Sequence, residues 1–186
     1  MNKYLSSPWP LLFWFAFYAL MGFYFMPSAM ERMLPFLQGQ SIPDLEAGYT
    51  YEHIMGLMDL MGLDGRETYR SILLVEDLIY PIVYAMLMAT GTGYFLTRTF
   101  PTIRLLWLLS IFPFFAMIAD YIENFSMVYI IANYPEVSPK IIDLASSATT
   151  IKWGFVFLSL LVLAAALLAH LFMRYVLMRK KTRNSE

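Results

Sequence analysis

The fold of this chain is constrained most by four apolar runs, which lie near residues 9–26, 72–96, 105–131 and 149–173. Each run is about as long as the roughly 20 residues that a helix needs to cross the hydrocarbon core of a bilayer. Charged residues concentrate in the segments between the runs and in the tail. The sequence therefore predicts an all-α polytopic membrane protein, built as a four-helix transmembrane bundle that forms one domain.

The composition agrees with a membrane protein and excludes several other classes. Hydrophobic residues make up 59% of the 186 residues, whereas a soluble domain has about 45–50% apolar residues. The net charge of −1 provides no basic field that would attract nucleic acid. The absence of cysteine excludes disulfides, thiolate metal sites and thiol catalysis. The expected partner is therefore the lipid bilayer, and nucleic acid is excluded.

The distribution of charge predicts the orientation of the bundle. The connection TRTFPTIR carries Arg98 and Arg104 without an acid, and the tail 174–186 is strongly basic, whereas the segment 27–71 is rich in acids. Because basic connections stay in the cytoplasm, we expect both termini to be cytoplasmic in a cell membrane and residues 27–71 to form an extracytoplasmic loop. No small-residue cleavage site follows the first run, so we expect a retained helix rather than a signal peptide.

The outer loop is too long to be a bare connection. Its segment YTYEHIMGLMDLMG combines an apolar set that includes Ile54, Leu57 and Met61 with the polar residues Glu52 and Asp59. This pattern predicts a short amphipathic helix that lies on the membrane surface or caps the bundle. The letters LDGR that follow are typical of a turn before the second transmembrane helix.

Polar side chains recur at helical spacing in three of the runs, and all of them fall in the outer halves. The spacing i, i+3, i+4, i+7 places each set on one face of its helix. The three sets are Asp77, Tyr80, Pro81 and Tyr84 in the second run, Asp120, Glu123, Asn124 and Met127 in the third, and Thr149, Lys152, Trp153 and Val156 in the fourth. Because an ionised side chain that faces lipid at mid-depth costs about 2.5–3.5 kcal/mol or more, we expect the three faces to meet inside the bundle.

The charges at this expected meeting point do not balance. One cation, Lys152, stands against four acids, Glu76, Asp77, Asp120 and Glu123. Four unpaired carboxylates do not all remain ionised in a low dielectric, so some must hold or share protons, bind a cation, or pair with Arg66 and Arg70 of the outer loop. The alternative is that polar groups such as Asn124 and Thr149 serve only as hydrogen bonds between helices.

A candidate metal site lies in the outer loop, where His53 precedes Met55, Met58 and Met61. Thioether and imidazole ligands suit Cu(I). Methionine is also an adaptable apolar filler, and with 14 methionines in the chain such spacings arise easily. The pattern leaves both interpretations open. His170, near the inner end of the fourth run, is typical of an interfacial residue rather than of a ligand.

Three stretches, GRETYRSILLVEDLIYPIVYAM, IADYIENFSMVYIIANYP and TTIKWGF, give the last two-thirds of the chain a family likeness. Their layout resembles that of small uncharacterised four-helix bacterial membrane proteins, with D-x-x-E-N as the most specific element, and this resemblance implies no activity. The chain is also similar, mainly in architecture, to the emopamil-binding protein and sigma-2 receptor superfamily. That resemblance implies acidic residues around an intramembrane sterol pocket, at the matching positions Glu76, Asp120, Glu123 and Trp153. The helix-embedded His170 lies at a different depth from the membrane histidine of the sterol isomerases.

Three functions follow from these observations as hypotheses. The first is a protein that binds or transports a lipid-like or cationic small ligand in an outer-half, carboxylate-lined pocket. Its candidate ligand-binding residues are Glu76, Asp77, Tyr80, Tyr84, Asp120, Glu123, Asn124, Thr149, Lys152 and Trp153. The second is an intramembrane enzyme for a lipid or isoprenoid, with Asp120 or Glu123 as general acid or base and Lys152 as electrostatic stabiliser. The third is a scaffold that docks another membrane protein through its polar stripes. No nucleotide, zinc or hydrolase motif is present, and no cofactor is indicated.

Overall fold

The computed structural model describes residues 7–183 and contains no strand within them. The elements are α2 (Pro8–Leu20), the π-helix η1 (Met21–Phe25), α3 (Met26–Leu37), the 3-10 helices η2 (Pro43–Leu45) and η3 (Arg104–Ile111), α4 (Tyr51–Thr99), α5 (Phe112–Asn133) and α6 (Pro139–Arg183). Four helical segments are long and apolar enough to cross a membrane: Pro8–Leu37, Tyr51–Thr99, Arg104–Asn133 and Pro139–Lys180. The predicted all-α fold with four such helices is confirmed.

The first long helix extends well beyond its predicted end at residue 26. α2, η1 and α3 form one continuous rod up to Leu37, where Gln38 adopts the left-handed conformation with φ 47° and ends the helix. The extension exists because α3 buries Ala29, Met33 and Leu37 against α4. Residues 27–37 are therefore part of a helix and not of a loop.

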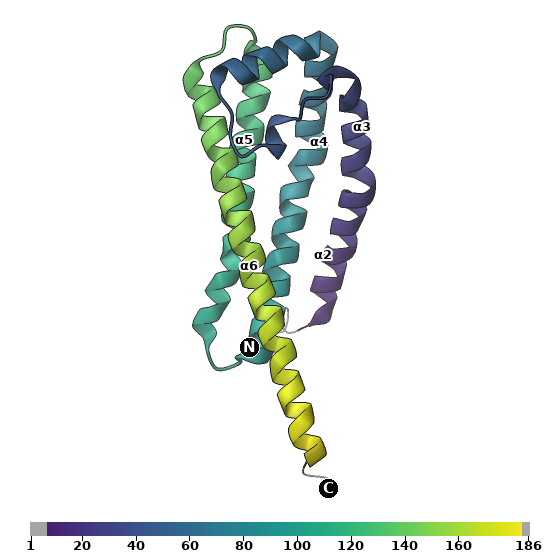
Figure 1. The fold of residues 1–186 in the computed structure, drawn as a ribbon, viewed down its shortest axis with the longest axis vertical. Helices are drawn as coiled ribbons and strands as arrows, with labels where there is room; N and C mark the ends of the chain where they lie inside the picture. The colour runs from purple at the N-terminus through teal and green to yellow at the C-terminus, as the bar shows by residue number, and fades with distance from the viewer. Residues whose placement is uncertain (1–6, 184–186) are drawn as a thin grey trace.

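α4 contains both the short helix expected in the loop and the second long helix. The two parts meet at Gly62, which is the only residue of α4 outside helical geometry and has φ 62°. A positive φ of this kind favours glycine, because it has no Cβ. The chain changes direction at Gly62 rather than in Leu63–Arg66, which is already helical, and the arm Tyr51–Met61 crosses the end of the bundle (Figure 1).

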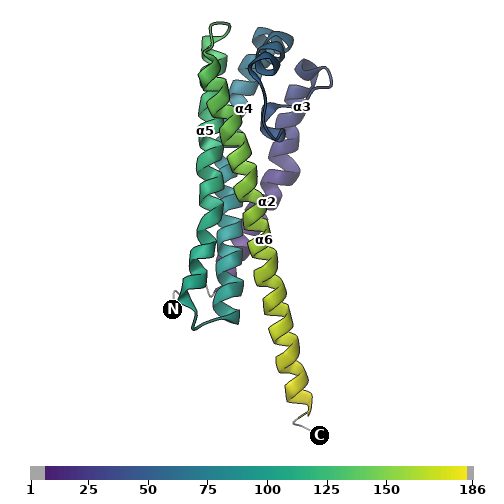
Figure 2. The same cartoon turned by 60° about the vertical axis from the view of Figure 1, so that its left-hand side comes forward.

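The third and fourth segments also depart from their predicted bounds. The run 105–131 is divided into η3 and α5, and the run 149–173 becomes the 45-residue α6. The C-terminal turns of α6 project past the rest of the bundle (Figure 2). The last residues of the predicted basic tail, 184–186, lie outside the described residues.

α4 lies at the centre of the bundle and packs against α2, α3, α5 and α6. The larger buried cluster is at the end crossed by the arm, which we call the cap end, and it joins α3, the arm, α4, α5 and α6 through residues such as Met33, Met58, Tyr69, Ile130 and Ile142. A second, smaller cluster around Tyr84 lies further along α4. The opposite end, where Thr99 bonds to His170 (3.1 Å), is called the tail end.

Close packing at the cap end gives a first testable prediction. A Cβ added to Gly65 would lie 2.8 Å from Phe36 Cβ and 2.9 Å from Met61 Cβ. Gly65→Ala should therefore lower the free energy of unfolding by about 1–3 kcal/mol, as overpacked sites do. Gly56→Ala is the matched control, because nothing lies within 4 Å of its added Cβ. Unfolding in detergent micelles measures both, and equal stabilities of the two variants would contradict this packing.

Candidate functional site

The three polar stripes face one another, as the sequence predicted. The side chains of Asp77, Asp120, Glu123, Asn124 and Lys152 are all buried, with 6% or less of each residue exposed. The Asn124 amide joins two helices, since Nδ2 donates to the Asp77 carbonyl (3.2 Å) and to Asp120 Oδ1 (3.3 Å). The stripes are covered by the protein itself, so they are not exposed for another membrane protein to dock on, as the scaffold hypothesis requires.

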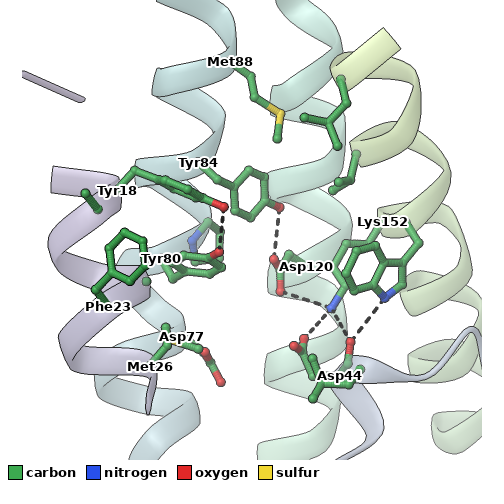
Figure 3. Close-up of a pocket in the computed structure, with 17 residues that line it drawn as sticks. Tyr18, Phe23, Met26, Asp44, Asp77, Tyr80, Tyr84, Met88, Asp120 and Lys152 are labelled. Carbon is green, nitrogen blue, oxygen red and sulfur yellow. Dashed lines mark hydrogen bonds and ion pairs between the residues drawn. The ribbon is translucent and has the colours of Figure 1, made fainter. Parts of the chain in front are cut away.

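Lys152 is the centre of the buried charges. Its Nζ lies 2.7 Å from Glu123 Oε2. It also forms ion pairs with Asp120, at 3.8 Å from Oδ1, and with Asp44, and these two are drawn in Figure 3. Asp44 was not among the predicted site residues. No local signal distinguishes it, because the same stretch SIPDLEAG also carries Glu46 two residues further on.

The segment 41–49, which we call the inserted loop, brings Asp44 into the bundle. α6 holds it by a series of hydrogen bonds: Trp153 Nε1 donates to the Asp44 carbonyl (3.2 Å), Thr150 Oγ1 to the Ala47 carbonyl (2.8 Å), and the Tyr49 amide to Ser146 Oγ (2.8 Å). Two predicted site residues, Lys152 and Trp153, therefore hold the inserted loop in place.

Tyr49 ends the inserted loop against Glu123 and Thr149. Burial, with a further contribution from the charge of Glu123, raises the pKa of the Tyr49 phenol well above its ordinary value. Tyr49 is thus a neutral phenol, and it accepts a hydrogen bond from Thr149 Oγ1 (3.3 Å). Glu123 and Thr149 lie behind this contact and do not line the cavity described next.

A cavity of about 570 Å³ lies beside the charged cluster, between α2 and α6 and over α4 (Figure 3). It is lined by Tyr18, Ala19, Gly22, Phe23, Met26, Asp44, Leu45, Asp77, Tyr80, Pro81, Tyr84, Met88, Asp120, Lys152, Trp153, Val156 and Leu160. Phe23 and Leu160 line the cavity and are also exposed, at 87% and 44%. The cavity therefore opens sideways, on the apolar surface of the bundle.

Asp77 differs from the other carboxyls of the cavity. Asp120 accepts a hydrogen bond from the Tyr84 hydroxyl (3.0 Å) as well as from Asn124. Asp77 lines the same cavity and is only 6% exposed, yet no described residue gives its carboxyl a hydrogen bond or an ion pair. A buried carboxyl without a partner costs free energy, so Asp77 is the carboxyl of the cavity wall that a ligand could still pair with.

Aromatic rings cover the wall next to Asp77. Tyr18 and Tyr80 stack with ring centroids 5.9 Å apart, and Tyr84 meets Tyr80 edge-on at 5.7 Å. Phe23 lies on the same side of the cavity (Figure 3). Tyr18 and Phe23 were missed by the sequence analysis because α2 and η1 carry no charged or amide side chain that would mark a site.

One predicted carboxyl and the two arginines expected to pair with the acids lie outside the cavity. The carboxyl is Glu76, which points away from the cavity and pairs with Arg32 of α3. Arg66 does not reach the site: its Nη1 donates to the Met58 carbonyl (2.7 Å). Arg70 pairs with Glu67 (3.6 Å). The prediction that Arg66 and Arg70 pair with the buried acids is therefore wrong. Lys152 pairs with two of the predicted acids, Asp120 and Glu123, and with Asp44.

The residues of the candidate copper site are engaged in other contacts. Met58 and Met61 are buried in the apolar cluster of the cap end, and Met55 packs against it. His53 Nε2 lies 3.2 Å from Glu46 Oε1 of the inserted loop. Within residues 7–183, one cluster of three carboxylates, Asp44, Asp120 and Glu123, has the geometry to hold a metal ion. The Lys152 ammonium forms ion pairs with all three.

The chain matches no family model, no curated protein and no solved structure.

Proposed function

We propose that this protein binds or transports a cationic amphiphile, which enters the cavity sideways from the bilayer with its charged group beside Asp77. The observation that carries the proposal is the unpartnered Asp77 carboxyl, buried in the wall of a cavity that opens on the apolar surface. A site of about 300–1,000 Å³ with apolar walls and few polar groups is typical of small-molecule binding.

The spacing of charges along the helices supports a position for the bilayer. Asp77 and Arg98 of α4 are 21 residues apart, and Lys152 and Arg174 of α6 are 22 apart, which corresponds to about 32 Å of helix. The hydrocarbon core is about 30 Å thick. The carboxyls then lie at one membrane boundary and the arginines at the other.

The charges favour the cap end as the extracytoplasmic side. No acid occurs between residues 78 and 119 or between 144 and 183, so the tail end is basic within the described residues. Basic ends stay in the cytoplasm. Both termini are then cytoplasmic, and the cavity belongs to the outer leaflet of the cell membrane.

The cavity matches an amphiphile that stands in this leaflet. Its carboxyls, including Asp77, are at the boundary, whereas Met88 lies at the other end of the cavity, deeper in the bundle (Figure 3). Val156 and Leu160 of α6 add apolar lining, four and eight residues beyond Lys152. Asp77 and Met88 are 11 residues apart on α4, which is about 16 Å of helix. A single chain with its head at Asp77 and its tail at Met88 keeps the orientation of the surrounding lipids.

Aromatic faces next to the carboxylate favour an organic cation as the head group. Tyr18 and Tyr80, with Phe23 beside them, offer the ring faces that attract ammonium groups. Gly22, the second residue of η1, leaves this part of the cavity wall without a side chain. π-turns within α-helices are frequent at functional sites.

Binding of dodecyltrimethylammonium to the protein in lipid nanodiscs tests the proposal. Asp77→Asn preserves the size of the side chain but removes its charge, and it should weaken binding by about tenfold or more, because an ion pair with the buried carboxylate is worth at least about 1.4 kcal/mol. Glu76→Gln is the matched control, since Glu76 is the adjacent carboxylate and faces Arg32. Equal affinities of wild type, Asp77→Asn and Glu76→Gln would reject the proposed site.

An intramembrane enzyme is the second candidate, and the Tyr84–Asp120 hydrogen bond favours it. Both residues line the cavity, and the hydroxyl and carboxyl are joined at 3.0 Å, which is a suitable arrangement for general acid or base catalysis on a bound lipid. Lipids extracted after incubation with the protein would contain a modified product, and Tyr84→Phe would abolish that product without weakening probe binding.

A further inference from the structure

The charges around the cavity have a negative excess. Lys152 contacts Asp44, Asp120 and Glu123, and Asp77 adds a fourth carboxyl. Among residues 7–183, no other ammonium or guanidinium pairs with these four carboxyls. One lysine cannot neutralise four carboxylates, so a buried site of this kind must hold other positive charges.

Titratable, charged and amide groups of every neighbouring element surround Asp77, and none of them neutralises it. Those that face it are Tyr69 and Tyr80 of α4, Asp120 and Asn124 of α5, Lys152 of α6, Asp44 of the inserted loop and Tyr18 of α2. Glu76 is its neighbour along α4 and points away from the cavity toward Arg32 of α3. Arg32 pairs with Glu76, and Lys152 contacts the other three carboxyls. An ionised Asp77 would be a buried charge without a counter-ion, which is costly.

We infer that the cavity exchanges a proton for its cation: without a ligand Asp77 carries a proton, and the arriving organic cation displaces it. In this step the O–H bond of the Asp77 carboxylic acid breaks, the proton passes to water, and the carboxylate forms an ion pair with the cation. One positive charge enters and one leaves, so the net charge of the site is constant. This inference rests on the proposed binding function and specifies its coupling to protons.

Calorimetry of dodecyltrimethylammonium binding in nanodiscs, repeated in buffers of different ionisation enthalpy, counts the released protons. The probe has a fixed charge and no proton to lose, so any proton that the buffer takes up on binding comes from the protein. The inference predicts release of about one proton per bound probe, and affinity that rises about tenfold per pH unit while Asp77 is protonated, within roughly pH 5 to 9. Empty nanodiscs give the blank for partitioning into lipid.

Three controls assign the proton to the ion pair. The uncharged analogue, in which carbon replaces the quaternary nitrogen, should bind without proton release. Asp77→Asn should bind the charged probe weakly and with no proton release, while Glu76→Gln should release as many protons as the wild type.

The outcomes separate the two proposals. Tight, Asp77-dependent binding without proton release at any pH in this range would overturn the inference and leave the binding function intact. Undiminished release from Asp77→Asn would overturn the assignment to Asp77. No binding of the probe to the wild type would overturn both.

Discussion

Lys152→Met should be the most destabilising single substitution at the site, lowering the free energy of unfolding by about 3–5 kcal/mol. Lys152 is 4% exposed and contacts Asp44, Asp120 and Glu123. Methionine preserves most of the side-chain volume but leaves three carboxyls, the buried Asp120 and Glu123 and the half-buried Asp44, without a cation. Because Lys152 also joins α5, α6 and the inserted loop, the loss should release the loop from the bundle.

The variant Lys140→Met is the control for this substitution. Lys140 lies in the first turn of the same helix and is exposed, so its replacement should change stability by less than about 0.5 kcal/mol. Adding Asp44→Asn to Lys152→Met should restore part of the lost stability, since it removes one uncompensated charge, and the two substitutions should therefore be non-additive. Unfolding in mixed micelles measures the wild type, Lys140→Met, Lys152→Met, Asp44→Asn and the double variant, and a Lys152→Met variant as stable as wild type would contradict the charge cluster.

The second large effect is expected on binding rather than on stability. Gly22→Leu should abolish binding of dodecyltrimethylammonium, or weaken it by about tenfold or more, while the protein stays folded. Gly22 lines the cavity, and nothing lies within 4 Å of a Cβ added there. A leucine side chain therefore enters the space that the amphiphile needs without a clash with the backbone.

Gly154→Leu is the matched control for the filled cavity. Gly154 is exposed on α6, is not part of the cavity wall, and likewise has nothing within 4 Å of an added Cβ. It should bind the probe like the wild type. The same loss of binding in both variants would indicate a general effect of bulk in the helices, and normal binding by Gly22→Leu would place the ligand outside the cavity.

The sequence was sufficient to predict the helical architecture and the meeting of the polar stripes. The i, i+3, i+4 spacing of Asp120, Glu123 and Asn124 places them on one face, and the cost of ionised groups in lipid directs that face inward. The buried Asn124 bonds to Asp77 and Asp120 are the contacts that this reasoning predicts.

The helix ends and the role of the loop could not be predicted in the same way. α3 and the arm Tyr51–Met61 are stabilised by tertiary burial of side chains such as Met33 and Met58, which hydropathy along one segment does not reveal. Asp44 joins the site across more than 100 residues of sequence, through Lys152 and Trp153. The pattern of residues within one segment does not show which distant residue it contacts, and so Asp44 was missed as a partner of Lys152.

The central claim is that an organic cation lies beside Asp77 with its chain directed toward Met88. A crystal structure from lipidic mesophase with dodecyltrimethylammonium carrying bromine on its terminal carbon tests this most directly. The account predicts one strong anomalous bromine peak in the cavity next to Met88 and Leu160, with head-group density at Asp77. A bromine peak at Asp77, or a cavity without the probe while bromine is ordered elsewhere, would contradict it.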